Sequence, residues 1–182
     1  LPNYSYVGFD QLESGRIAAE HAIKKGGNSI LLVSSPSLFG ASWRGNAFAD
    51  YCLQHGVNLE HNTISADTSI RAGYELGKAL VRSNRLKKVI FCTYDMTALG
   101  ISSALSEENI SVGKDVQIIT TSSSDEDLLA YSNPPITTID LKFRDLCYMA
   151  MRLAMDIATG RASYPQEISL HPSIAYRTSC PM

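Results

Sequence analysis

The segment KVIFCTYDMTALG, residues 88–100, decides the fold class of this 182-residue chain. Its first six residues form a continuous run rich in β-branched and aromatic side chains, which predicts a strand buried on both faces. The residues that follow place Ala98, Ile101 and Leu105 on one face at helical spacing. A buried strand that leads into an amphipathic helix is the repeating unit of parallel α/β sheets.

The same unit recurs in both directions along the chain. Strands are predicted at residues 4–9, 29–34, 62–65, 88–93, 116–121, 136–139, 168–170 and 174–176. Helices are predicted at residues 11–26, 42–55, 69–82, 95–108 and 143–159. Strands that alternate with helices pair in parallel through right-handed crossovers. The predicted fold class is therefore α/β, with a doubly wound and mostly parallel sheet.

Composition excludes several classes of protein. The formal net charge of −2 gives no basic surface for nucleic acid. The longest apolar run falls far short of the ~20 residues of a membrane span, so we expect no membrane partner. Cys52, Cys92 and Cys147 have apolar neighbours and are predicted to be buried thiols, which favours a reducing, cytoplasmic location. Because the chain begins at Leu1 without Met, we expect a piece of a longer protein.

A search for catalytic motifs finds none. The sequence contains no glycine fingerprint for dinucleotides, no phosphate-binding loop and no nucleophile elbow. The four histidines show no spacing typical of a metal site. We therefore expect no cofactor, no metal and no enzymatic activity.

Three features lie where parallel strands end, which is the edge at which such sheets bind ligands. The first is a loop from Phe39 that runs into a helix carrying Arg44. A cation near a helix start opposes the helix dipole, which suggests a clamp on sugar hydroxyls or a carboxylate. The alternative is a surface arginine that bridges to Asp50 or Asp67.

The other two features follow the strands at 88–93 and 116–121. Tyr94 is the better ligand candidate of its pair, because Asp95 suits the N-cap or first turn of a helix. The hydroxyl-rich segment 120–125 could bind polyols or an anion, or it could be a loop with Ser/Thr turns. We predict a ligand edge formed by Phe39, Arg44, Tyr94 and Ser122, with Asp95 in its wall.

These features occur in an order that resembles the LacI/GalR family of bacterial transcription regulators. Arg44 opens a segment similar to the family's R-x-x-G-F, with Ala47 in place of glycine. Residues 92–100 resemble N-D-x-x-A-x-G, with Tyr94 in place of asparagine. Further similar segments, in order along the chain, are residues 10–21, 112–116, 134–139 and 176–179.

The resemblance implies a periplasmic-binding-protein-like fold of type I and a binding module rather than an enzyme. Residues 4–136 would form the C-terminal core subdomain, and 137–182 would be a return segment shared between two subdomains. A small molecule, either a sugar, a sugar phosphate or a related metabolite, would shift the angle between subdomains and thereby modulate DNA binding. Operator DNA would be contacted only through an N-terminal helix-turn-helix head that is missing here.

Two departures from the family pattern bear on the ligand. Tyr94 replaces the ligand-binding asparagine, and the ligand-binding aspartate would fall on Ser122 or Ser124. An ordinary pentose or hexose would lose two partners. The alternative functions are a periplasmic sugar-binding receptor of an ABC transporter and an α/β enzyme with an unrecognised site.

The resemblance also implies a homodimer. Its interface would use the helix from Met96 and the segments at 69–74 and 128–131, so a charge at Ile101 or Leu129 should disrupt it. Large apolar side chains in those segments fit this expectation, although they could simply cover the sheet edge. The helix at 143–158 is apolar on most faces, so part of its surface should lack a partner.

Overall fold

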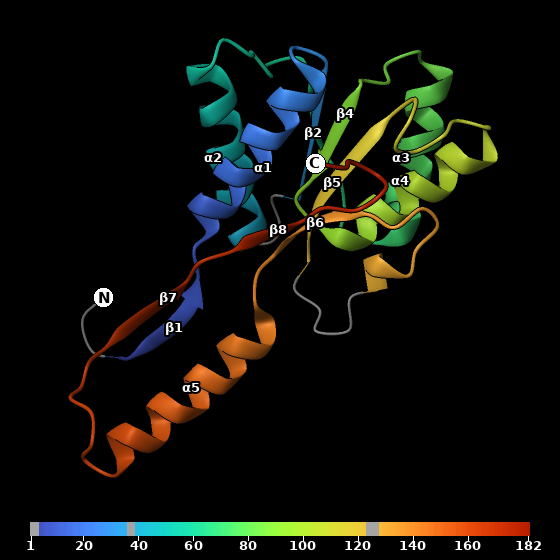
Figure 1. The fold of residues 1–182 in the computed structure, drawn as a ribbon. Coiled ribbons are helices and arrows are strands. Elements are labelled where there is room, and N and C mark those ends of the chain that lie inside the picture. The colour runs from blue at the N-terminus through green and yellow to red at the C-terminus, as the bar shows by residue number, and fades with distance from the viewer. Residues whose placement is uncertain (1–3, 36–38, 123–127) are drawn as a thin grey trace.

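The computed structural model describes residues 4–35, 39–122 and 128–182, with the side chain of Phe39 left out. The main body is a six-stranded sheet with the order β3-β2-β4-β5-β6-β8 (Figure 1). Neighbouring strands in this sheet pair in parallel, except β6 and β8, which pair antiparallel. The strands are β2 (Ile30–Ser34), β3 (Thr63–Ser65), β4 (Val89–Cys92), β5 (Gln117–Ser122), β6 (Thr137–Asp140) and β8 (Ser173–Ala175). The predicted doubly wound, mostly parallel sheet is confirmed.

Two helix pairs cover the two faces of this sheet. Helices α1 (Gln11–Gly26) and α2 (Phe39–Gln54) lie on one face, and α3 (Ile70–Arg82) and α4 (Asp95–Glu107) lie on the other (Figure 1). Phe91 of β4 stacks on Phe48 of α2, with ring centroids 4.5 Å apart, in the first core. Ile90 and Ile118 point into the second core beneath α4. Strands β2, β4 and β5 therefore bury both of their faces, as their continuous apolar runs predict.

Side-chain caps and close contacts fix the helices. Asp10 Oδ1 accepts a hydrogen bond from the Glu13 N–H at 2.8 Å and caps α1. Ser69 caps α3 as the sequence predicts, accepting from the Ala72 N–H at 3.1 Å. Helices α3 and α4 approach so closely that a Cβ on Gly100 would lie 2.0 Å from the Ile70 carbonyl oxygen. Only glycine fits at this crossing.

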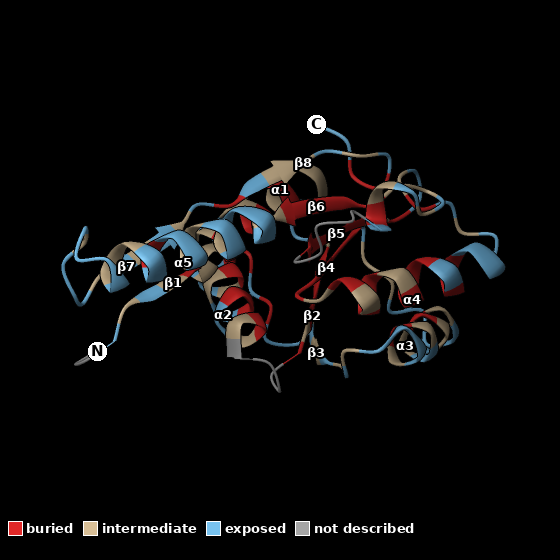
Figure 2. Cartoon of the chain, turned by 90° about the horizontal axis from the view of Figure 1, so that it is seen from below, coloured by how far each residue is buried: buried red, intermediate tan, exposed pale blue. Residues whose placement is uncertain are grey.

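An arm projects from the main body. It consists of β1 (Tyr6–Phe9), β7 (Glu167–Leu170) and α5 (Phe143–Ala158), and β1 pairs with β7 in a parallel sheet of their own (Figures 1 and 2). Strand β1 therefore does not extend the run of parallel strands in the main sheet. In the arm this strand is only partly covered, and Tyr6 is exposed.

Helix α5 has a largely uncovered apolar surface. Leu153 is its only buried residue, whereas Tyr148 and Met151 are 62% and 69% exposed (Figure 2). The expectation that this helix lacks part of its partner surface is confirmed. The same exposure makes the prediction of a buried Cys147 wrong, while Cys52 and Cys92 are buried free thiols as predicted.

A buried polar network holds the C-terminal segment against the sheet. The Ser179 hydroxyl donates to the Ile118 carbonyl at 2.6 Å and accepts from the Thr137 N–H at 2.8 Å. The Thr137 hydroxyl lies 2.8 Å from the Cys180 carbonyl. These bonds satisfy buried polar groups that would otherwise destabilise the core, which explains the hydroxyl residues Thr137 and Ser179.

Candidate functional site

The candidate site lies at the carboxyl ends of β2, β4 and β5, the edge that the sequence predicts. Thr93, directly after β4, connects the three strands there. Its hydroxyl accepts a hydrogen bond from the Ser35 N–H at 3.0 Å, and its carbonyl accepts one from the Thr121 hydroxyl at 3.0 Å. The ends of the strands are thus fixed relative to one another, which gives the site a rigid base.

Arg44 extends from α2 into this edge and is only 6% exposed. Its Nη2 donates to the Thr93 carbonyl at 2.8 Å, and its Nη1 donates to Gln11 Oε1 at 2.6 Å. Its Nε is buried and has no hydrogen-bond partner among the described residues. Burial lowers the pKa of Arg44 to about 10, against the opposing effect of the Asp95 carboxylate. The alternative of a surface arginine bridging to Asp50 or Asp67 is wrong.

Tyr94 and Asp95 begin the neighbouring helix. Tyr94 is the N-cap residue of α4, with an extended backbone and a partly buried side chain. Asp95 takes the first-turn place that the sequence allows, with its Oδ1 accepting from the Met96 N–H at 2.9 Å. Burial raises the pKa of Asp95, while backbone N–H groups and the Arg44 cation oppose the rise. Asp95 therefore forms a buried acidic wall close to a buried cation.

The structure places the remaining predicted residues unevenly. Ser122 is the last residue of β5 and is buried beside Thr121, at the same edge as Thr93. Phe39 begins α2, but its side chain lies outside the described residues. Ser124, the other position considered for the family's aspartate, also lies outside them. The described members of the predicted edge, Arg44, Tyr94, Asp95 and Ser122, all lie at the ends of β4 and β5 or extend toward them.

Two residues that hold Arg44 were missed by sequence reasoning. Gln11 is 33 positions away along the chain, and no pattern in the sequence links the two side chains. Thr93 accepts through its backbone carbonyl, which carries no residue-specific signal. The position of Thr93 at the end of a buried strand was the one available indication.

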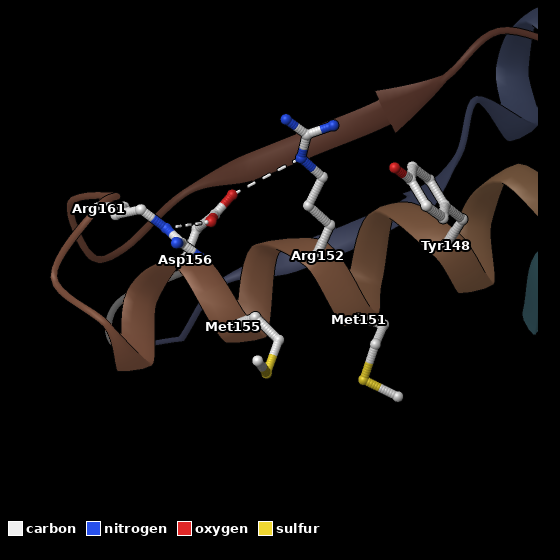
Figure 3. A pocket seen from close by; sticks show the side chains of 6 residues that line it. All are labelled: Tyr148, Met151, Arg152, Met155, Asp156 and Arg161. Atoms are coloured by element: carbon white, nitrogen blue, oxygen red, sulfur yellow. Dashed lines mark hydrogen bonds and ion pairs between the residues drawn. The ribbon is translucent and has the colours of Figure 1, made fainter.

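Four pockets lined by described residues lie away from this edge. The pocket on α5, of about 670 Å³, lies along the open face of the arm (Figure 3). Asp156 there pairs with Arg161 at 3.0 Å and lies 3.8 Å from Arg152, while Met151 and Met155 point to the other side of the helix (Figure 3). Within the described ranges no group of three His, Cys, Asp or Glu residues could hold a metal ion. None of the helices described is long and apolar enough to cross a membrane.

Comparisons with known proteins agree with this architecture. The profile of the periplasmic binding protein-like domain family matches residues 19–180. The HTH-type transcriptional repressor PurR of Actinobacillus pleuropneumoniae serotype 3 (strain JL03) is 30% identical over 178 residues, covering 93% of this chain and 51% of the repressor. The chain thus spans about half the length of the PurR repressors that it matches.

Solved structures show the same fold. A LacI family transcription regulator from Clostridium acetobutylicum superposes with a TM-score of 0.89 at 25% identity, covering 97% of this chain and 66% of that one. A LacI family regulator from Enterococcus faecium with bound ribose superposes with a TM-score of 0.85 at 22% identity, covering 97% and 65%. These relatives are regulators rather than enzymes, in agreement with the prediction from the sequence. The chain belongs to the periplasmic binding protein-like domain family, in the form found in transcription regulators of the LacI/GalR type.

Proposed function

We propose that the chain is the effector-binding domain of a LacI/GalR-type transcription regulator and that Arg44 grips the effector. The observation that carries the proposal is the buried Nε of Arg44, which lacks a partner among the described residues. A buried N–H without a partner is costly, and a ligand oxygen at this point would satisfy it. The edge of a parallel sheet is also where ligands of this fold class bind.

The chemistry of the site favours a ligand rich in acceptor oxygens. The two partners of Arg44 are the neutral oxygens of Gln11 and Thr93, so they leave its positive charge unbalanced by direct contact. Tyr94 and Ser122 offer hydroxyls where the family pattern has an amide and a carboxylate. A phosphate or carboxylate oxygen would pair with the cation more strongly than a neutral hydroxyl would. We therefore propose a sugar phosphate or related anionic metabolite as effector, ahead of a neutral sugar.

Signalling would pass through the junction between main body and arm. Three segments cross this junction, from β1 to α1, from β6 to α5 and from β7 to β8 (Figure 1). We propose that residues 4–136 form one core subdomain, except that β1 lies in the arm, and that 137–182 return between two. This return segment supplies β6 and β8 to the body and α5 and β7 to the arm. An effector that prefers one angle of the junction shifts the population of states. The DNA contacts of the regulator would lie outside this chain. The regulator would act in the cytoplasm.

The regulator would act as a homodimer through one face of the main body. Ile70 and Leu128 are about half exposed, at 49% and 53%, and Tyr131 is 93% exposed. Unpartnered apolar side chains of this size are typical of protein interfaces. Ile101 and Leu129 are fully buried in the core, however, so the expectation that either would face its own copy is wrong. The interface we propose is therefore centred on Ile70, Leu128 and Tyr131.

A thermal-shift screen of the full-length protein tests the effector proposal. The compounds are D-ribose 5-phosphate, D-ribose and hypoxanthine, tested on wild type and on Arg44→Met. The matched control is Arg16→Met, which removes an exposed arginine paired with Glu13 on α1. A compound that binds and is present at a concentration of 100 times its Kd should raise the free energy of unfolding of the wild type and the control by about 2.7 kcal/mol. It should leave the stability of Arg44→Met unchanged. Equal stabilisation of Arg44→Met and wild type would show that Arg44 does not bind the effector.

A further inference from the structure

We infer that Gln11 is the positioning residue for Arg44, fixing its guanidinium in the site without neutralising it. This inference rests on the proposed function of Arg44 as the effector grip. Gln11 Oε1 accepts from Arg44 Nη1 at 2.6 Å, the shorter of the two hydrogen bonds that hold the side chain. No feature of the family resemblance assigns a role to this position.

The two hydrogen bonds determine where the free donor points. A guanidinium is planar, with its five N–H donors in a fixed fork. Because Nη1 is held by α1 and Nη2 by the end of β4, the plane of the group and the direction of its Nε–H are fixed together. Gly40 makes room for this arrangement, since a Cβ there would lie 3.0 Å from Gln11 Nε2 and 3.4 Å from Arg44 Nη1.

The neutrality of Gln11 matters as much as its reach. A glutamate at this position could hold the same nitrogen, but its charge would balance the cation before any ligand arrived. The amide supplies an oxygen and no charge. Arg44 therefore keeps its cation available, and Asp95 acts on it through its field rather than through a direct ion pair within the described residues.

Gln11 also lies at the junction between body and arm. It directly follows Asp10, which caps α1 and ends the connection from β1 of the arm. Asp10 Oδ2 lies 3.8 Å from His171 Nδ1, in the connection from β7 to β8. A movement of the junction would therefore be transmitted to the hydrogen bond that orients Arg44.

The test is the rate at which phenylglyoxal modifies Arg44 in the full-length protein, followed by mass spectrometry. Gln11→Met removes the acceptor, and Gln11→Asn shortens it by one methylene so that it no longer reaches. Both should raise the Arg44 rate at least about tenfold, as expected for loss of a hydrogen bond to a charged group. Gln11→Glu keeps an oxygen at the same reach and adds a charge that pairs with the cation, so the Arg44 rate should fall below that of wild type.

Two controls separate positioning from general loosening. Leu12→Ala changes the neighbouring exposed side chain and should leave the Arg44 rate unchanged. Arg177 is an internal reference in the segment after β8, and its rate should be constant in every variant. The inference is overturned if Gln11→Met and Gln11→Asn label Arg44 at the wild-type rate, or if Arg177 accelerates in parallel. The experiment needs no effector, so its failure is distinct from a failure of the thermal-shift screen.

Discussion

Replacing Arg44 with Met should change the stability of the protein very little, although the side chain is almost fully buried. Burial lowers the pKa of Arg44 from its ordinary 12.5 to about 10, and one pKa unit corresponds to about 1.4 kcal/mol. Keeping this charge in the folded state thus costs about 3 kcal/mol. Its two hydrogen bonds, at about 1.5 kcal/mol each, recover a similar amount. Since Met fills much of the same volume, the net change should lie within about 2 kcal/mol.

Urea unfolding of the full-length protein measures this change, with Phe48→Ala as the comparison. Phe48 is a fully buried aromatic in the core beneath α2, and its removal should cost about 3–5 kcal/mol. A loss above about 3 kcal/mol for Arg44→Met would instead make Arg44 a structural residue that the fold requires. A small loss combined with a lost effector response would assign Arg44 to binding.

Three further predictions concern other parts of the molecule. Burial lowers the pKa of His21 below its ordinary 6.5, so the unfolded chain takes up a proton first as pH falls. The contribution of neutral His21 should be complete above pH 6.5 and lost below it, so wild type should lose more stability than His21→Gln between pH 7.5 and 5 in urea titrations. Gly100→Ala should lower the free energy of unfolding by about 2 kcal/mol or more, because its Cβ would meet the Ile70 carbonyl. Ser103→Ala, on the exposed face of α4, should leave it unchanged, and calorimetric unfolding of both variants measures the difference. Tyr131→Glu should shift the full-length protein toward monomer in sedimentation, whereas Leu53→Glu, an exposed position on α2, should leave it dimeric; two equal profiles would place the interface elsewhere.

The parts of the fold that follow from local physics could be predicted from the sequence. The run at 88–93 and the run at 29–34 are apolar without interruption, which is possible only in strands covered on both faces. Each is followed by a helix in the predicted order, so the order of the elements and the edge at which ligands bind in such sheets follow directly. The expected helix at residues 11–26 matches α1 at both ends.

The parts that depend on long-range packing could not be predicted. The apolar spacing of Ile101 on α4 is compatible with either a core or an interface, and only the position of α3 decides for the core. Cys147 has apolar neighbours in sequence, yet the face of α5 that carries it has no partner in the structure. The orientation of Arg44 depends on Gln11, a contact between two helices that no periodicity reports.

A ligand oxygen should complete the hydrogen bonding of Arg44. A crystal structure of the full-length protein with the compound that gives the largest thermal shift tests it most directly. An acceptor atom of that compound should lie about 2.7–3.2 Å from Arg44 Nε, with the bonds from Arg44 to Gln11 and Thr93 intact. A compound bound elsewhere, with Arg44 Nε still lacking a partner, would show that Arg44 Nε does not bind the effector.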